Sequence, residues 1–319
     1  MLQGADGGVA GGLFPPTLPV WAAAERSAAG RAWLAGLPEL VEELRQRWSL
    51  RLGPPFPGGS CSWVAPARGP QGRPVVLKVR RPHPEAAGEA EALRCWAGRG
   101  AVRLHRCDRE RYALLIERCE PGDALGSADR LRTEERLLVG AGILRELWIA
   151  PPPEPAGLER LGAVTGEWAD LAQERAARLR PAFDPGLVAH GVRLLRELPA
   201  SATREVVLHG DFHPGNVLAA RRRDWLAIDA KPMVGDPGYD PWPLLEQLDD
   251  PFAHADPVRV LTERFALLAD ALDEDVRRLQ AWAVARRVES ALWMLEHGDS
   301  AGALETLGRV RVLAGLAGL

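Results

Sequence analysis

The segment from His209 to Asn216 constrains this chain more than any other stretch of its sequence. It reads His-Gly-Asp-Phe-His-Pro-Gly-Asn, and Asp229 follows thirteen residues after its end, beyond a run patterned as a short β-hairpin. A carboxylate, an amide five residues later and a second carboxylate after a hairpin form a pattern typical of phosphoryl transfer. In that pattern Asp211 receives or orients the proton of an acceptor hydroxyl. Asn216 and Asp229 supply oxygen ligands for Mg²⁺ against the phosphates of ATP.

Two residue types are so rare that their positions carry weight. Asn216 is the only asparagine among 319 residues, and Lys78 and Lys231 are the only lysines among 40 basic residues. Lys78 lies in an apolar run with β-branched residues, which predicts a buried strand. Its ammonium can reach the α- and β-phosphates of ATP, and we favour this role over a strand-edge lysine that only reaches water. Lys231 either contacts a phosphate or is simply exposed.

The helix expected after the Lys78 strand carries two candidates for the acidic partner of this lysine, Glu89 and Glu91. One of them is expected to pair with Lys78 and fix its ammonium, while the other faces solvent. We expect Glu89 to be the partner.

Two further segments are predicted to contact ATP. Gly58 and Gly59 form a turn whose backbone N–H groups can approach phosphates, although the chain has neither a full Gly-x-Gly-x-x-Gly pattern nor a Walker motif. The stretch around Glu117 and Cys119 is expected to meet the adenine ring. Its contacts would be made by the main chain, through the Glu117 carbonyl and the Cys119 N–H.

His209 and His213 flank the predicted catalytic carboxylate. Two histidines beside an aspartate can belong to a metal hydrolase, but no third ligand set is near and Mg²⁺ prefers oxygen ligands. We therefore expect both histidines to hold the loop through backbone hydrogen bonds, with a role as catalytic base as the alternative.

Composition excludes several classes of protein. Hydrophobic residues make up 46% and charged residues 26% of the chain, as in ordinary globular proteins. A net charge of −3 gives no reason to expect nucleic-acid binding, and no apolar run is long enough to span a membrane. The start of the chain lacks the pattern of a signal peptide, and the four cysteines form no C-x-x-C pair. These features favour a cytoplasmic protein with reduced thiols, expected to be a monomer, with a dimer as the alternative.

The pattern of the chain changes near its middle from β-rich to mostly helical, which predicts an α+β protein of two lobes. We expect a flexible tail at 1–20, a small nucleotide-binding lobe with a leading helix at 21–117, a connector at 118–126 and a larger helical lobe at 127–319. Helices are predicted at Trp21–Leu50, Pro84–Ala97, Ser127–Ala150 and Val164–Leu198, and from Tyr239 onward. Strands are predicted at Cys61–Ala65, Pro74–Arg80, Val102–Cys107, Tyr112–Glu117, Val206–His209, Val217–Ala220 and Trp225–Asp229.

Together these motifs resemble the aminoglycoside phosphotransferases, and most closely the branch of streptomycin 6-phosphotransferases and hydroxyurea-resistance kinases. The resemblance extends from about Gly30 to the C-terminal helices. It rests on Gly30–Pro38, Val76–Val79, Gly88–Arg94, Leu114–Arg118, Leu208–Leu218 and Trp225–Asp240.

The resemblance implies a protein-kinase-like fold, with a small antiparallel sheet and one helix in the first lobe, and transfer of the γ-phosphoryl of Mg-ATP to an antibiotic hydroxyl. By position, it implies Asp211 as the catalytic base, Asn216 and Asp229 as metal ligands, and Lys78 with Glu89 as the phosphate-positioning pair. Ala230 stands where proline is frequent in this branch, and the Gly-rich loop matches poorly. These departures put the acceptor in doubt more than the reaction.

An acidic segment follows the second metal ligand. Between Pro232 and Pro257 there are six acidic residues and no lysine or arginine, which favours a cationic acceptor. The two guanidinium groups of streptomycin would suit paired carboxylates, whereas hydroxyurea is small and neutral. The alternative is a solvated helix face with caps, and Asp240 could instead bond back to the catalytic loop. The residues predicted to contact the acceptor are Asp236, Asp240, Glu246 and Asp249.

Three other kinds of function are alternatives to an aminoglycoside kinase. A kinase for hydroxyurea, a sugar, an amino-alcohol or a choline-like metabolite would use the same motifs. A protein kinase is disfavoured because Ala-Lys rather than Phe-Gly follows Asp229 and no long activation segment is present. A nucleotide-binding regulator without turnover would have no chemical need for all four of Lys78, Asp211, Asn216 and Asp229.

Overall fold

The computed structural model describes residues 10–82, 88–153 and 157–319. The chain divides into two compact units. The small unit comprises residues 1–98 and 102–122, and the large unit comprises residues 99–101 and 123–319. The change from one unit to the other after Gly122 lies within the stretch that the sequence suggested as a connector.

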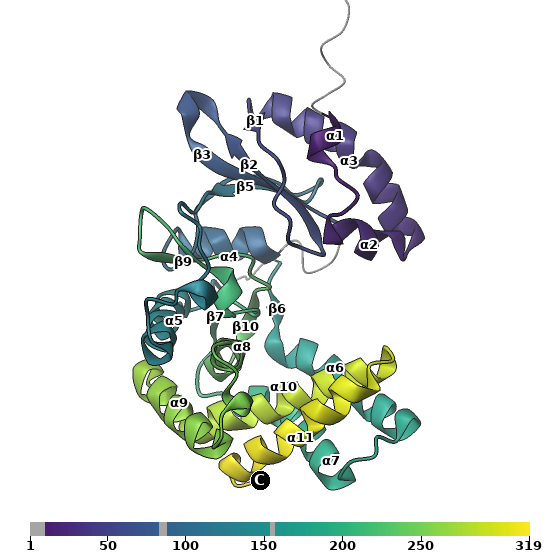
Figure 1. Ribbon diagram of the computed structural model, residues 1–319, viewed down its shortest axis with the longest axis vertical. Coiled ribbons are helices and arrows are strands. Elements are labelled where there is room, and N and C mark those ends of the chain that lie inside the picture. The colour runs from purple at the N-terminus through teal and green to yellow at the C-terminus, as the bar shows by residue number, and fades with distance from the viewer. Residues whose placement is uncertain (1–9, 83–87, 154–156) are drawn as a thin grey trace, which may run out of the picture. The chain divides into compact units, whose positions relative to one another are not determined.

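The small unit is built on a five-stranded sheet in which all neighbouring strands run antiparallel (Figure 1). Four of these strands were predicted, because apolar and β-branched residues alternate or cluster along them. The two-residue strand β1 is too short to show any periodicity. In spatial order the strands are β1 (Arg51–Leu52), β2 (Ser62–Arg68), β3 (Pro74–Arg80), β5 (Ala113–Glu117) and β4 (Leu104–Asp108).

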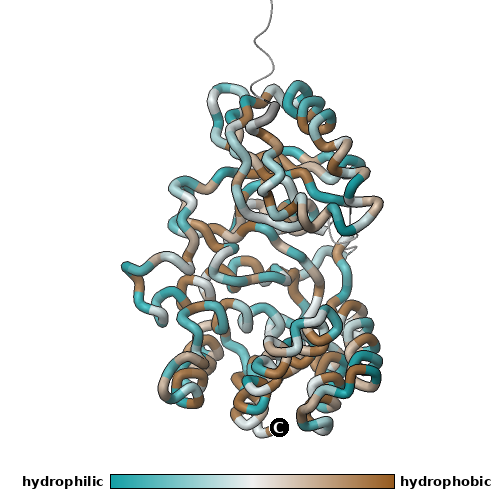
Figure 2. Tube along the Cα trace, turned by 45° about the vertical axis from the view of Figure 1, so that its right-hand side comes forward, coloured by the Kyte–Doolittle hydropathy of each residue, from teal (hydrophilic) through white to brown (hydrophobic). Residues whose placement is uncertain are grey.

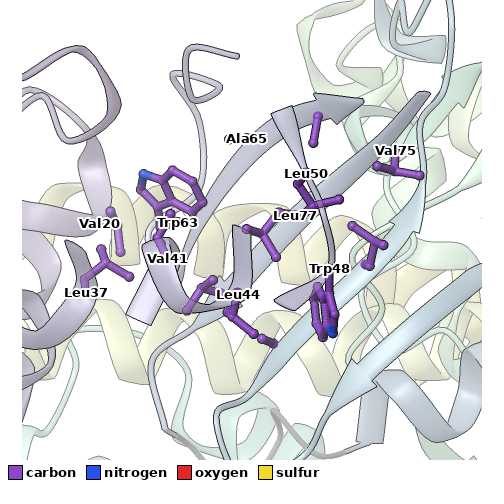
Figure 3. Close-up of a cluster of buried hydrophobic side chains, with 14 of the residues drawn as sticks. Val20, Leu37, Val41, Leu44, Trp48, Leu50, Trp63, Ala65, Val75 and Leu77 are labelled. Atoms are coloured by element: carbon purple, nitrogen blue, oxygen red, sulfur yellow. The ribbon is translucent and has the colours of Figure 1, made fainter. Parts of the chain in front are cut away.

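The two faces of this sheet have different roles because successive side chains of a strand point to opposite sides. Leu77 of β3 lies in the hydrophobic core with Leu44 of the helix α3 (Ala28–Arg47) and Trp63 of β2 (Figure 3). The next residue, Lys78, points to the other face, where it contacts the helix α4 (Gly88–Trp96). The packed core thus fixes the strand that carries the predicted phosphate-binding lysine. The predicted start of α4 at Pro84 falls on residues 83–87, outside the described residues.

The leading helix is interrupted, which corrects the prediction of one helix from Trp21 to Leu50. The structure has α2 (Pro19–Glu25) and then α3, whose N-cap Ser27 accepts a hydrogen bond from the Gly30 N–H at 3.0 Å. A Cβ atom at Gly30 would lie 2.0 Å from the Ala24 carbonyl oxygen, so only glycine allows the two helices to approach this closely.

The described part of the expected tail packs onto the sheet. This part begins with helix α1 (Ala10–Leu13). The Trp63 indole donates a hydrogen bond to the Leu13 carbonyl at 2.8 Å. Phe14 stacks on the Trp63 ring with a centroid distance of 5.6 Å. From Leu13 onward the segment therefore belongs to the core of the small unit rather than to a loose tail.

The large unit is mostly helical, and α10 lies at its centre with side chains buried on all sides, as Trp282, Val284 and Val288 show. Figure 2 shows hydrophobic and hydrophilic stretches alternating along these helices. Within the described ranges, no helix combines the length and the apolar character needed to cross a membrane. The helices are α5 (Thr133–Leu147), α6 (Leu161–Leu179), α7 (Pro185–Ala200), α8 (Pro241–Gln247), α9 (Pro257–Leu272), α10 (Val276–Glu296) and α11 (Ser300–Ala317).

The predicted helix from Val164 to Leu198 is also two helices. Helix α6 ends at Leu179; its C-cap Arg180 has a left-handed φ of 43°, and Pro181 follows. Asp184 then caps α7 by accepting a hydrogen bond from the Gly186 N–H at 2.9 Å, with Pro185 in the first turn. Apolar periodicity continues across this break, which explains why the pattern alone missed it.

Short strands surround the catalytic segment in the large unit. One small sheet has the order β6 (Glu159–Arg160), β10 (Met233–Gly235), β7 (Val206–Leu208), and β8 (Val217–Ala219) pairs with β9 (Trp225–Ala227) as a hairpin. Strands β7, β8 and β9 were predicted. Strands β6 and β10, of two and three residues, were not predicted.

Candidate active site

Lys78 and Glu89 form a buried ion pair in the small unit. The Lys78 Nζ lies 2.8 Å from Oε1 and 2.7 Å from Oε2 of Glu89, and the Arg80 guanidinium lies 3.0 Å from the same Oε2. Glu91 instead contacts Arg94 near the surface at 3.1 Å. Buried charges require such partners, and one carboxylate between two cations leaves a net positive charge, which suits phosphate binding.

Arg80 was missed by the sequence reasoning. The signal was present, since residues two apart on a strand share one face, so that Arg80 had to lie beside Lys78. The abundance of arginine in the chain hid this signal.

The other predicted nucleotide contacts also lie in the small unit. Gly58 and Gly59 lie in the exposed loop that leads into β2, and Gly59 has a φ of +95°, which favours glycine. Glu117 ends β5, where its side chain accepts a hydrogen bond from the Arg103 N–H at 3.0 Å and its own N–H donates to the Arg103 carbonyl at 2.8 Å. Cys119 is buried two residues later.

Asp240 holds the start of the catalytic loop in the large unit. One of its oxygens accepts hydrogen bonds from the His209 N–H at 2.9 Å and the Trp148 indole at 3.1 Å, and the other accepts from the Gly210 N–H at 2.8 Å. Its exposed fraction is 0%. The prediction that Asp240 contacts the acceptor is therefore wrong, and the alternative that it bonds back to the loop is correct.

The loop backbone turns at Gly210, which has a φ of +80°. A Cβ atom there would lie 1.9 Å from the Lys231 carbonyl oxygen, so the chain after Asp229 packs directly against the loop. The Lys231 N–H also donates a hydrogen bond to the His209 carbonyl at 2.9 Å. Only glycine permits both contacts at this position.

Both histidines stabilise the loop. The buried His209 ring accepts from the Asp211 N–H at Nδ1, 3.3 Å away, and donates from Nε2 to the Ile228 carbonyl at 3.0 Å. Burial lowers the pKa of His209 below its usual value, so the ring stays neutral in this arrangement. His213 caps the turn η4 (Pro214–Asn216) by accepting from the Gly215 N–H at 3.1 Å.

The hairpin brings Asn216 next to Asp229. Val217 pairs with Ala227, and the Ile228 N–H donates to the Asn216 carbonyl at 2.9 Å, which places Asp229 beside the end of the loop. The Asn216 side-chain NH₂ donates to the Asp211 carbonyl at 3.0 Å, so its amide oxygen is the group suited to a cation. Asp229 itself has a left-handed φ of 57°, which is costly for a residue other than glycine.

This pair fits Mg²⁺ by the chemistry of its donors. Both residues offer oxygen, and Mg²⁺ is usually held by one or two carboxylates together with substrate phosphates and water. Among the residues that the structure describes, no group of three or more His, Cys, Asp or Glu side chains could hold a metal ion.

Lys231 lies next to the predicted catalytic carboxylate. Its Nζ is 2.9 Å from Asp211 Oδ2, with the two side chains 46% and 27% exposed. The sequence left the role of Lys231 open, and the rarity of lysine was the only feature that singled this residue out.

A cavity of about 380 Å³ in the large unit extends to Asp211. It contains as many carboxylates as arginines. Glu246 pairs with Arg287, and Asp250 lies 3.0 Å from Arg309. Burial, together with the nearby Arg309, lowers the pKa of Arg287 to about 10. The cavity is lined by Asp211, Trp242, Pro243, Glu246, Gln247, Asp250, Arg286, Arg287, Ser290 and Arg309.

Two buried donors in this cavity are unsatisfied. The Trp242 Nε1–H and the Arg287 Nε–H have no hydrogen-bond partner among the described residues. Buried polar groups are usually paired, and both residues line the cavity, so these donors are candidates for contact with ligand oxygen atoms.

Of the other predicted acceptor residues, one lines the cavity and two contact arginines outside it. Glu246 lines the cavity, whereas Asp236 is buried and accepts from the Gly238 N–H at 3.0 Å and from Arg278 Nε at 2.8 Å. Asp249 lies outside the cavity lining and contacts Arg264 at 2.8 Å. The prediction for Asp236 is therefore wrong, because this carboxylate is buried and bonded within the protein, whereas the role of the exposed Asp249 stays a prediction.

The sequence of this chain is similar to those of known antibiotic resistance kinases. The family model of aminoglycoside/hydroxyurea antibiotic resistance kinases matches residues 47–298. Streptomycin 6-kinase of Streptomyces glaucescens is 38% identical over 273 residues, which is 85% of this chain and 87% of that protein. Hydroxyurea phosphotransferase of Kitasatospora aureofaciens is 37% identical over 291 residues, which is 91% of this chain and 83% of that protein.

A solved structure shows the same fold. The crystal structure of a spectinomycin phosphotransferase with ADP and spectinomycin has a TM-score of 0.56 at 12% identity, and the match covers 88% of this chain and 96% of that one. These similarities confirm the α+β, protein-kinase-like fold and the resemblance predicted from the motifs.

Proposed function

Because the chain belongs to the family of aminoglycoside/hydroxyurea antibiotic resistance kinases, we propose that it transfers the γ-phosphoryl of ATP to a hydroxyl of a streptomycin-like aminoglycoside. The observation that carries this proposal is the cavity that Asp211 lines in the large unit. Its volume of about 380 Å³ falls in the range of pockets for small-molecule ligands, which runs from roughly 300 to 1,000 Å³.

Asp211 orients the acceptor. Its carboxylate accepts the hydrogen bond of the acceptor hydroxyl and aims the oxygen at the γ-phosphorus, and most of the gain comes from this positioning. Asp240 and His209 support the geometry, because they fix the backbone on both sides of Gly210. The proton of the hydroxyl passes to Asp211 as the bond to phosphorus forms.

The nucleotide is held by the residues of the small unit. Lys78, oriented by Glu89, contacts the α- and β-phosphates, and the turn at Gly58 and Gly59 offers backbone N–H groups to them. The main chain of Glu117 and Cys119 meets the adenine ring. The buried Lys78–Glu89 pair supports this assignment because it fixes the ammonium in one direction.

Asn216 and Asp229 are the residues that would hold Mg²⁺. Mg²⁺ supplies positive charge that neutralises the phosphate oxygens when it is bound. The hairpin register supports this role because it brings the backbones of Asn216 and Asp229 together. The Asn216 NH₂ group donates to the Asp211 carbonyl, which leaves the amide oxygen as the group for the cation.

The chemistry of the cavity supports a cationic, hydroxyl-rich acceptor. Glu246 and Asp250 can bind guanidinium or amino groups in bidentate fashion. The unpaired donors of Trp242 and Arg287 suit hydroxyl or ether oxygens. Since Glu246 is paired with Arg287, a cationic group of the acceptor would share or exchange this carboxylate rather than meet it unpaired.

A second candidate acceptor is hydroxyurea, because the relative from Kitasatospora aureofaciens bears that name. A molecule of a few heavy atoms would leave most of the cavity to water and would contact few of its charged groups. The cavity therefore favours the larger acceptor.

Acceptor-dependent release of ADP tests the proposal. Purified protein with Mg-ATP is offered a panel of aminoglycosides, hydroxyurea and small polyols, and we expect streptomycin to give the largest kcat/KM. Asp211→Ala should abolish turnover while ATP still binds. If no acceptor raises ADP release above background, the proposed function is wrong. If Asp211→Ala keeps full turnover, the assignment of the catalytic carboxylate is wrong.

A further inference from the structure

Both lysines of the chain contact a carboxylate of the active site. Lys78 pairs with Glu89 in the small unit, and Lys231 pairs with Asp211 in the large unit. The remaining 38 basic residues are arginines. The first pair has a role in the proposed mechanism, whereas the second has none, although its partner is the carboxylate that meets the acceptor.

The backbone of Lys231 is fixed to the catalytic loop. Its N–H donates to the His209 carbonyl at 2.9 Å, and its carbonyl oxygen packs where a Cβ of Gly210 would otherwise lie. Pro232 then limits the backbone that follows. The ammonium therefore projects from a rigid base beside Asp211, so its position does not depend on a flexible segment.

A simple surface ion pair is the competing explanation. Such pairs contribute at most about 1 kcal/mol to stability and are common on this protein. Arg223, which also lies near the β8–β9 hairpin, pairs with Glu146 at 2.9 Å with 48% of its side chain exposed. Lys231 matches it in distance and, at 46%, in exposure, but it contacts the predicted catalytic carboxylate instead. This similarity makes Arg223 a matched control.

We propose, on the basis of the proposed function, that Lys231 is a positioning residue for Asp211 and stabilises the charge of the transferring phosphoryl group. By holding Oδ2, its ammonium turns Oδ1 toward the acceptor hydroxyl. An ammonium has three N–H donors, so it can hold Asp211 and contact a phosphoryl oxygen at the same time.

The step balances without any further reactant. The acceptor oxygen forms a bond to the γ-phosphorus, and the bond from this phosphorus to the bridging oxygen breaks, with its electron pair leaving on ADP. The hydroxyl proton passes to Asp211. Negative charge on the equatorial phosphoryl oxygens is stabilised by a fixed cation more in the transition state than in the ground state.

Three variants test this role: Lys231→Met, Lys231→Arg and the control Arg223→Met. We expect Lys231→Met to lower kcat about 100-fold, as loss of one fixed donor at a developing anion does in other enzymes, with the KM values for ATP and acceptor changed much less. Lys231→Arg should restore part of the loss, since it keeps the charge but not the compact geometry. Arg223→Met should keep wild-type kcat.

A second measurement does not depend on turnover. ADP with aluminium fluoride mimics the transferring phosphoryl group, and Lys231→Met should bind this complex more weakly by a factor similar to the loss in kcat, while its affinity for ADP alone stays unchanged. Thermal unfolding of each variant shows that the protein is folded.

The outcomes separate the two proposals. If wild-type protein turns over an acceptor but Lys231→Met stays within twofold of its kcat and binds ADP–aluminium fluoride equally well, the role of Lys231 is overturned. The same holds if Arg223→Met loses as much activity as Lys231→Met. If the wild-type protein phosphorylates no acceptor of the panel, the proposed function fails, while the ADP–aluminium fluoride comparison still decides the role of Lys231.

Discussion

Replacement of Asp240 by alanine is expected to destabilise the large unit and to disable the catalytic loop together. The carboxylate accepts three hydrogen bonds, from the N–H groups of His209 and Gly210 and from the Trp148 indole, and it is fully buried. Alanine leaves all three donors unpaired in a site closed to solvent. Each unpaired buried donor costs about 1–3 kcal/mol, so the three together should lower the free energy of unfolding by roughly 3–9 kcal/mol.

The size of the large unit converts this loss into a measurable shift. For a domain of about 200 residues, each kcal/mol lowers Tm by roughly 2–4 °C, so Asp240→Ala should melt at least roughly 6 °C below wild type. Asp240→Asn keeps the shape of the side chain but replaces one acceptor with a donor, so about 1–3 kcal/mol should be lost. Both variants should also lose kcat, because the loop that carries Asp211 is no longer held.

The assay pairs differential scanning calorimetry with ADP-release kinetics, and Asp249→Ala is the control from the same acidic segment. Asp249 is largely exposed, and its partner Arg264 also donates to the carbonyls of Leu248 and Asp249, so this variant should lose less than about 1 kcal/mol. If Asp240 contacted the acceptor instead, Asp240→Ala would raise the acceptor KM and leave Tm unchanged. That result would refute the structural role.

Two other changes test the proposed phosphate-binding lysine and the cavity of the large unit. Lys78→Met should raise the KM for ATP and lower kcat, because the phosphates lose a fixed cation, while Arg80 keeps Glu89 paired and limits the loss of stability. ATP titration and calorimetry check this against Arg94→Met, which removes an exposed partner of Glu91 on the same helix and should change neither. Trp242→Phe removes the unpaired indole donor of the cavity and should raise the acceptor KM about 5- to 10-fold with the ATP KM unchanged. An equal change in both KM values would contradict a role confined to the acceptor.

The sequence predicted the parts of the site whose members are close along the chain. Lys78 and Glu89 are eleven residues apart, and a strand followed by a helix is enough to bring them together. The hairpin likewise joins Asn216 to Asp229 by local register. In both cases one member of the pair, Lys78 or Asn216, is of a type that is rare in this chain, so that the pattern stood out from the arginine-rich background.

The acceptor side could not be predicted because its partners are distant in sequence. Asp236 meets Arg278, which is 42 residues away, and Asp250 meets Arg309, which is 59 residues away. A count of charges between Pro232 and Pro257 shows an acidic segment, but tertiary packing adds an arginine to most of its carboxylates. The helix breaks after α2 and α6 were missed for a related reason, since apolar periodicity continues through a cap or a left-handed residue.

The pairing of these carboxylates with arginines limits how much electrostatic attraction contributes to acceptor recognition. In an unpaired acidic pocket, a cationic acceptor would gain the full attraction of each carboxylate. Here Glu246 and Asp250 already have the partners Arg287 and Arg309, so a guanidinium of the acceptor gains only the difference between two similar pairs. Discrimination among acceptors must then come from shape and from hydrogen bonds that the residues lining the cavity leave unmade. The indole of Trp242 and the Nε–H of Arg287 are such donors, and a ligand oxygen placed against them relieves a cost that the protein otherwise bears.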